Sequence, residues 1–183
     1  MNSSVLTRIW LYLFVLLTSN SIFAATDHGH HKAHVHGVSE LKLAIDTQNI
    51  DIHFQSPANN IVGFEHSAIS KKEKQRVKKA TEILSNPALL FLFGGTDCTA
   101  TSSSIDMGGL LDSHNKHTQQ DAHNEITAHY RFQCQSISQL NHIEIQLFNQ
   151  FTIISEINAQ WISEIHQGMS TLTPDNTQLV INK

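Results

Sequence analysis

Two neighbouring segments, 35–46 and 49–55, carry apolar residues at every second position. These positions are Leu41, Leu43 and Ile45 in the first segment, and Ile50, Ile52 and Phe54 in the second. Because residues at i, i+2 and i+4 of a strand point to one face, each segment predicts a strand with one buried face. The link at residues 47–48 is short, so we expect the two strands to form a hairpin.

In the next segment, 69–87, apolar residues recur at helical spacing and no longer at every second position. Ser70 and Glu73 have the spacing of a capping box, and Pro87 follows the segment. Apolar or small residues recur between them at Val77, Ala80, Thr81 and Leu84. The pattern predicts a helix of about four turns. Its six Lys and Arg residues within 71–79 allow two interpretations, an anion-binding site or a solvated outer face. The solvated face is favoured, because the apolar positions are those that face the core.

Shorter segments complete the predicted architecture. They are a buried turn or short helix at 88–93, an extended segment at 96–107, a polar loop at 110–125, alternating strands at 126–134, 140–148 and 155–165, and an edge strand at 178–181. Consecutive strands with one principal helix predict an α+β fold. We expect a single domain whose mostly antiparallel β-sheet is packed on one face by that helix.

The first 25 residues have the pattern of a secretory signal peptide. Arg8 precedes an apolar run at 9–17, and 18–25 turns polar and ends in small residues. The alternative is a membrane anchor, but the run is shorter than the ~20 residues that a spanning helix needs. We therefore predict a signal peptide at 1–24, a His-rich N-terminus at 25–33 and a metal-binding domain at 34–183. No later segment is apolar enough to span a bilayer, so no membrane association is expected after cleavage.

Charge and cysteine content narrow the class of protein further. The net charge of −4 argues against nucleic acid and anionic membrane surfaces as partners. Cys98 and Cys134 are the only cysteines, and in an exported chain such a pair predicts a disulfide. The alternative of thiolate metal ligands or a redox pair lacks the close spacing that those sites use. A disulfide would leave nitrogen and oxygen atoms as the metal ligands.

Histidine is unusually frequent, with 13 residues against 12 Lys plus Arg. The stretch T-D-H-G-H-H-K-A-H-V-H-G at 26–37 contains five of them, which are His28, His30, His31, His34 and His36. His34 and His36 would share one face of a strand, about 6 to 7 Å apart at their bases. Two ring nitrogens can then reach one ion at about 2.0 to 2.1 Å. A β-bulge at Gly37 would reverse the face to which they point.

Two further histidine groups are candidate ligands. Glu65 and His66 follow Gly63 in V-G-F-E-H-S, where both could bind one metal or Glu65 could orient a histidine. The alternative is an ordinary loop, with Glu65 favoured by the positive helix N-terminus. The loop at 111–125 carries His114, His117 and His123 among acidic residues, a composition typical of a collector of several ions.

Three other histidines, His53, His129 and His142, fall on the polar faces of the predicted strands. For His53 and His142, as for His166, we favour the interpretation of tolerated surface residues.

Six segments, taken in their order along the chain, resemble the ZrgA-like family of His-rich periplasmic zinc-binding proteins. They are H-V-H-G-V-S-E-L-K-L-A-I-D, S-P-A-N-N-I-V-G-F-E-H, G-T-D-C-T, Y-R-F-Q-C, L-N-H-I-E-I-Q-L-F-N-Q-F and I-N-A-Q-W-I. The likeness runs from about His34 to Leu179. It implies a periplasmic location and a role in zinc uptake beside the solute-binding subunit of a zinc ABC transporter.

The same resemblance implies particular site residues. The family's H-x-H-G matches His34, His36 and Gly37, its G-F-E-H matches 63–66, and its cysteines match Cys98 and Cys134. One departure is that Ser67 and Ala68 stand where the family has Ala-Pro, which puts the rigidity of this loop in doubt. The His-bearing loop is also short for the family.

The favoured function is therefore metal binding without catalysis. Imidazole and carboxylate ligands suit Zn²⁺, Cu²⁺ and Ni²⁺, and affinity alone would favour Cu²⁺. Zinc is chosen mainly on the resemblance. The alternatives are metal storage or buffering, a pH-sensing envelope protein whose histidines charge near pH ~6, and a metal-dependent hydrolase. A hydrolase would need three fixed ligands and a general base, and no H-E-x-x-H motif is present.

Overall fold

The computed structural model describes residues 35–111 and 124–181. The predicted signal peptide, the His-rich N-terminus and nearly all of the predicted His-bearing loop lie outside the described residues. So do seven of the candidate ligands, which are His28, His30, His31, His34, His114, His117 and His123. The positions of these residues stay predictions.

The described residues contain nine strands, one principal helix and several short helices. The strands are β1 (Val38–Ile45), β2 (Asn49–Pro57), β3 (Phe91–Gly94), β4 (Cys98–Asp106), β5 (Glu125–Cys134), β6 (His142–Ile145), β7 (Glu156–Ile162), β8 (Gln167–Leu172) and β9 (Gln178–Val180). The α-helices are α2 (Ala58–Val62), α3 (Lys71–Leu84) and α4 (Leu147–Gln150), and the 3₁₀ helices are η1 (Pro87–Leu89), η2 (Gly108–Leu111) and η3 (Ile137–Gln139). The fold is α+β, as predicted.

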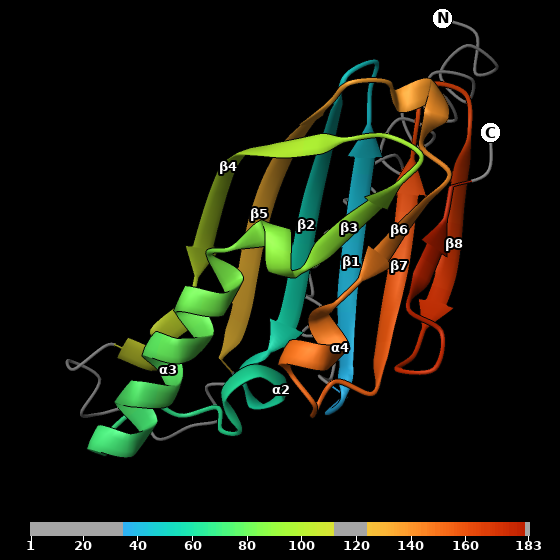
Figure 1. Ribbon diagram of the computed structural model, residues 1–183. Coiled ribbons are helices and arrows are strands. Elements are labelled where there is room, and N and C mark those ends of the chain that lie inside the picture. Colours follow the sequence, from blue (N-terminus) through green and yellow to red (C-terminus); the bar gives the residue numbers. More distant parts are fainter. Residues whose placement is uncertain (1–34, 112–123, 182–183) are drawn as a thin grey trace, which may run out of the picture. The chain divides into compact units, whose positions relative to one another are not determined.

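Two sheets form the domain (Figure 1). The larger has six strands in the order β4-β5-β2-β1-β7-β8, antiparallel except for the parallel pair β1 and β7. The smaller has the order β3-β6-β9 and is antiparallel. Helix α3 and the small sheet lie against the same face of the large sheet: Tyr130 Oη of β5 donates to the carbonyl of Leu84, and Phe91 of β3 stacks edge-on against Tyr130. This covered face is the inner face, and the opposite one is the outer face.

The core lies between the large sheet and these covering elements. The inner-face residues of the central strands are at most 5% exposed, and they are Leu41, Leu43, Ile45, Ile50, Ile52, Phe54, Tyr130 and Phe132. Each apolar side chain of this size stabilises the fold by about 1.5 to 3 kcal/mol when fully buried. The predicted alternation and the predicted hairpin of β1 and β2 are both confirmed.

Helix α3 begins with the predicted capping box. Ser70 Oγ accepts from the Glu73 N–H, and Glu73 Oε2 accepts from the Ser70 N–H at 2.8 Å. The backbone N–H groups of Ser70 and Ile69 hold the pKa of Glu73 below its ordinary value. The six basic residues of the helix are exposed, as the solvated-face interpretation expects. In the part of the chain that the structure describes, no helix is both long and apolar enough to cross a membrane.

The predicted disulfide between Cys98 and Cys134 is present. It joins β4 to β5 where these two residues pair across the strands. Because β4 lies at the edge of the large sheet and exposes most of its residues, this bond anchors a strand that buries little apolar surface.

Two local predictions were wrong. The segment 88–93 is not a turn or short helix alone, because only its first residues belong to η1 and β3 follows, paired with β6. The segment 140–148 is not one strand, because β6 ends at Ile145 and α4 begins at Leu147. In both cases a short apolar run left the choice between helix and strand to tertiary pairing.

Candidate metal site

The candidate site begins at a turn immediately before β1. The Val38 N–H donates to the Val35 carbonyl at 3.1 Å and closes this turn. Gly37 has φ of +87°, in the left-handed region that glycine adopts most readily. A Cβ atom there would lie 2.5 Å from Ser155 Oγ, so a larger residue would also displace this hydroxyl from the Gly37 carbonyl. His36 therefore lies in a turn and not in a strand, which corrects the expectation that it sits on a strand beside His34.

A buried amide holds this turn in place. Asn60 of α2 is 1% exposed. Its Oδ1 accepts from the Gly37 N–H at 2.8 Å, and its Nδ2 donates to the Val38 carbonyl at 2.9 Å. Nδ2 also lies 3.3 Å from Ser56 Oγ. A buried amide with satisfied donors and acceptors fixes its partners firmly, so Asn60 sets the backbone position from which His36 projects.

Strand β7 holds the other side of the turn. The Gly37 carbonyl accepts from the Ser155 N–H at 2.8 Å and from the Glu156 N–H at 3.0 Å. Ser155 Oγ donates to the same oxygen at 3.2 Å. The turn that carries His36 is thus fixed between α2 and the start of β7, two elements far apart in sequence.

Glu65 and His66 follow the end of α2. Gly63, with φ of +83°, caps this helix, and its N–H donates to the Asn59 carbonyl at 2.9 Å. Asn124 Nδ2 donates to the Glu65 carbonyl. Ser67 Oγ donates to the Gly109 carbonyl at 3.0 Å, and the Ala68 N–H donates to the Leu110 carbonyl at 2.8 Å. These bonds hold the segment in place although it lacks the proline of the family pattern.

The fold brings His36 and Glu65 together across 29 residues of sequence. His36 Nε2 lies 3.2 Å from Glu65 Oε1. The imidazole is 64% exposed and the carboxylate 17%, so the pair opens to solvent on the side of the histidine. Imidazole nitrogen and carboxylate oxygen are both ligands of Zn²⁺. The pair can bind one ion together, or the carboxylate can orient the imidazole from behind.

His66 is adjacent in sequence but makes different contacts. Its ring stacks on Phe64 with centroids 5.0 Å apart, and Nδ1 lies 3.0 Å from the Ser67 carbonyl oxygen. A carbonyl only accepts, so this contact favours the neutral tautomer with its proton on Nδ1, in which the Nε2 lone pair is available to an ion. Between residues 35 and 181, leaving out 112–123, no three metal-ligating side chains converge. His66 thus follows Glu65 in sequence, but its ring packs on Phe64 and does not join the pair.

The predicted His-bearing loop starts and ends beside the same segment. Its described flanks are Leu111 at the end of η2 and Asn124 before β5. The neighbouring backbone of η2 binds Ser67 and Ala68, and Asn124 binds the Glu65 carbonyl. Asn124 Oδ1 also accepts from the Gly109 N–H at 3.0 Å and ties the two flanks together. Both ends of the loop are therefore held at the segment that carries Glu65 and His66.

Sequence reasoning found His36, Glu65 and His66 but missed Asn60 and Asn124. Asn60 carried no signal that distinguishes it from its neighbour Asn59, which is only half-buried. The hydrogen-bond partners of Asn60 cannot be identified from the sequence. Asn124 carried no local signal.

The α+β domain thus places an imidazole and a carboxylate, two ligand types that Zn²⁺ accepts, side by side at a turn fixed by buried hydrogen bonds. The chain matches the model of the ZrgA family zinc uptake protein over residues 33–181, and it belongs to this family. The match includes both halves of the His36–Glu65 pair. No curated protein matches the chain.

Proposed function

We propose that the protein is a periplasmic zinc-binding protein that captures Zn²⁺ at an ordered site and assists its uptake. The site is built on His36 and Glu65, and His34 and His66 turn toward them when an ion binds. The observation that carries this proposal is the 3.2 Å contact between His36 Nε2 and Glu65 Oε1. His34 is two residues from His36 along the chain. Together with Glu65 and His66, these two histidines would give the ion four nitrogen and oxygen ligands.

Membership of a zinc uptake family supports zinc as the proposed metal. The ligand types alone also accept Cu²⁺ and Ni²⁺, and Cu²⁺ would bind most tightly. The disulfide occupies both cysteines, so thiolate ligands do not enter the choice. Zinc as cargo also suits a site that is open to solvent at His36, because the ion must enter and leave.

Capture takes place in two stages. The histidines of 25–33 and of the loop at 111–125 bind ions weakly, and the ordered site then holds one ion more tightly. This order is supported by the flanks of the loop, both of which are bonded to the segment that carries Glu65 and His66.

Release follows protonation or transfer to a partner. Histidine ligands must be neutral to bind an ion, so affinity falls as the pH falls below their pKa. The partner of this proposal is the solute-binding subunit of a zinc ABC transporter. A storage protein would bind zinc equally well but would not pass it on. Transfer from the loaded protein to that purified subunit, measured with a fluorescent zinc indicator, separates the two functions.

Calorimetric titration with Zn²⁺ tests the ordered site. The protein would start at Ala25 and carry no tag. One variant lacks 26–32 and has His114, His117 and His123 replaced by Asn, and a second carries His34→Ala and His36→Ala. The proposal expects one tight site to survive in the first variant and to disappear in the second. Loss of all binding in the first variant would mean that only the collector segments bind zinc.

A further inference from the structure

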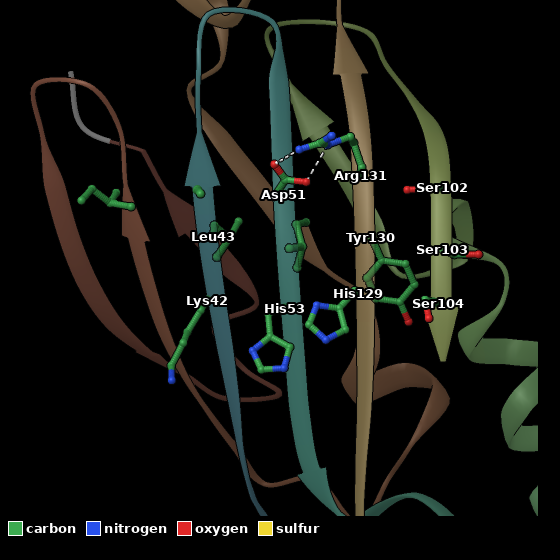
Figure 2. Close-up of a pocket in the computed structure, with 13 residues that line it drawn as sticks. Lys42, Leu43, Asp51, His53, Ser102, Ser103, Ser104, His129, Tyr130 and Arg131 are labelled. Carbon is green, nitrogen blue, oxygen red and sulfur yellow. Dashed lines mark hydrogen bonds and ion pairs between the residues drawn. The ribbon is translucent and has the colours of Figure 1, made fainter. Parts of the chain in front are cut away.

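The outer face of the large sheet carries a second pair of histidines. His53 of β2 pairs directly with His129 of β5, and the row continues to Lys42 on one side and Ser104 on the other. Figure 2 shows the two imidazoles side by side on adjacent strands, flanked by Lys42 and Ser104. They line a hollow of about 480 Å³ in this face.

The two rings occupy the same small volume. Their centroids are 4.3 Å apart and their planes differ by 17°, so they stack. Residues directly opposite each other on antiparallel strands have Cβ atoms about 4.5 to 5.5 Å apart. From bases this close, rotation of both rings about their side-chain bonds brings one nitrogen of each within about 2.0 to 2.1 Å of a shared ion. The two stacked rings can therefore form a bidentate site by side-chain rotation alone, without movement of the strands.

The surroundings of His53 favour its neutral form. Burial lowers the pKa of His53, and the positive charges of His129 and Lys42 lower it further. Glu125 and Glu40 act in the opposite direction with smaller effect. The other charged groups in the hollow, Asp51 and Arg131, neutralise each other through bonds of 2.7 and 2.8 Å. A neutral imidazole keeps the lone pair that a metal ion requires.

We propose that His53 and His129 form a second metal-binding site, which takes a divalent transition-metal ion through one nitrogen of each ring. Two protein ligands leave the other coordination positions to water, so the site binds more weakly than a closed four-ligand site and exchanges its ion readily. With imidazole ligands alone, the order of affinity places Cu²⁺ above Ni²⁺ and Zn²⁺. Lys42 does not block the ion, because its ammonium group lies toward Glu40, 3.7 Å from Oε2.

This site is distinct from the one at His36. Lys42, which pairs with His53, lies four residues into β1 from Val38, or about 13 Å along the strand. None of the residues in the hollow takes part in the hydrogen bonds that fix Gly37 or Glu65. The proposal therefore stands whether or not the ordered site at His36 and Glu65 binds zinc.

The test resolves individual histidines, because the chain contains many others. Proton–nitrogen correlation spectra of the imidazoles would be recorded for the full tag-free protein during titration with Zn²⁺, which is diamagnetic and shifts signals without erasing them. We expect the signals of His53 and His129 to move together along one saturation curve. In His53→Gln, the remaining His129 should bind at least about 10- to 100-fold more weakly, the loss that perturbed metal sites commonly show.

The matched control is His142→Gln, a histidine on β6 of the small sheet, which should leave the His53 and His129 curve unchanged. Circular dichroism checks that each variant is folded. Separate curves for the two rings, or an unchanged His129 curve in His53→Gln, would overturn the shared site. Neither result would bear on the His36 site, which the calorimetric experiment tests.

Discussion

The position of His36 depends on a residue that binds no metal. Asn60 accepts a hydrogen bond from the Gly37 N–H and donates one to the Val38 carbonyl, and its side chain is buried. The proposed ligand His36 is largely exposed, whereas the side chain that positions its turn is in the core. At the scale of single residues, a buried side chain therefore determines where the exposed His36 lies.

Asn60→Asp tests this dependence. The acid keeps an oxygen for the Gly37 N–H but places its second oxygen against the Val38 carbonyl, where the amide donated at 2.9 Å. We expect a loss of about 1 to 3 kcal/mol in the free energy of unfolding, the usual result of leaving a buried group unsatisfied, together with weaker zinc binding. Urea unfolding and calorimetry measure the two effects. Asn59→Asp, half-buried in the same helix, is the matched control and should change neither.

Gly37→Ala should also destabilise the turn, for two separable reasons. The left-handed φ costs about 1 to 2 kcal/mol for an L-residue, and the new Cβ would lie 2.5 Å from Ser155 Oγ. The double variant Gly37→Ala, Ser155→Ala removes the contact but keeps the strain. Thermal unfolding should therefore place the double variant between the wild type and Gly37→Ala. A double variant no more stable than the single one would show that the clash contributes nothing.

His53 gives stability a dependence on pH. Its pKa in the folded protein lies below the ordinary value of about 6.5, so the unfolded chain binds this proton more readily than the folded one. Stability contributed here is complete above pH ~6.5 and decreases as the pH falls through that value toward the folded pKa. Urea unfolding of the wild type and His53→Gln between pH 5 and 8 should show a shallower acid loss in the variant. Parallel curves would contradict this assignment.

At the scale of elements, β4 is the strand that most needs a covalent anchor. It lies at the sheet edge and exposes nearly all of its side chains. The disulfide spans 36 residues of sequence. In the chain-entropy account, closing a loop of this length contributes about 3.5 to 4 kcal/mol.

Replacing Cys98 and Cys134 by Ser should remove about that much free energy of unfolding. Amide exchange should also become faster in β4 than in β2, which lies inside the sheet. Zinc binding by the folded variant should stay the same, because Cys134 and Glu125 are at opposite ends of β5 and Asn124, next to Glu125, contacts the candidate site. Reduced zinc affinity in a folded variant would contradict this separation.

The elements predicted correctly are those whose signals are local. The hairpin of β1 and β2 follows from alternation with a short link, and α3 follows from Ser70 and Glu73 with helical spacing behind them. Strand β3 was missed because its few apolar residues become a strand only by pairing with β6. The parallel pairing of β1 with β7 joins segments that are far apart in the sequence. The alternation within each strand does not indicate which strand it pairs with, so this pairing could not be predicted.

At the scale of the whole molecule, the candidate site also combines features that the sequence predicts with features that depend on the fold. Its ligand types were identified from the sequence and the family resemblance, since histidine and glutamate beside glycine are visible in the sequence itself. The meeting of His36 with Glu65 and the role of Asn60 depend on three-dimensional neighbours. Sequence reasoning also placed His53 and His129 on the polar faces of their strands, but their stacking required the register of β2 with β5.

The pairing of β1 with β7 also bears on the stage of folding at which the candidate site can form. The Gly37 carbonyl receives its hydrogen bonds from Ser155 and Glu156, so the turn of His36 is completed by the last third of the chain. Contacts between residues so distant in sequence form late and slowly in folding. A chain that has emerged only as far as β6 already carries His36 and Glu65 but lacks half of the support that holds them. Tight metal binding at the proposed site would therefore require a chain in which the segment before β7 has already docked on the turn of His36.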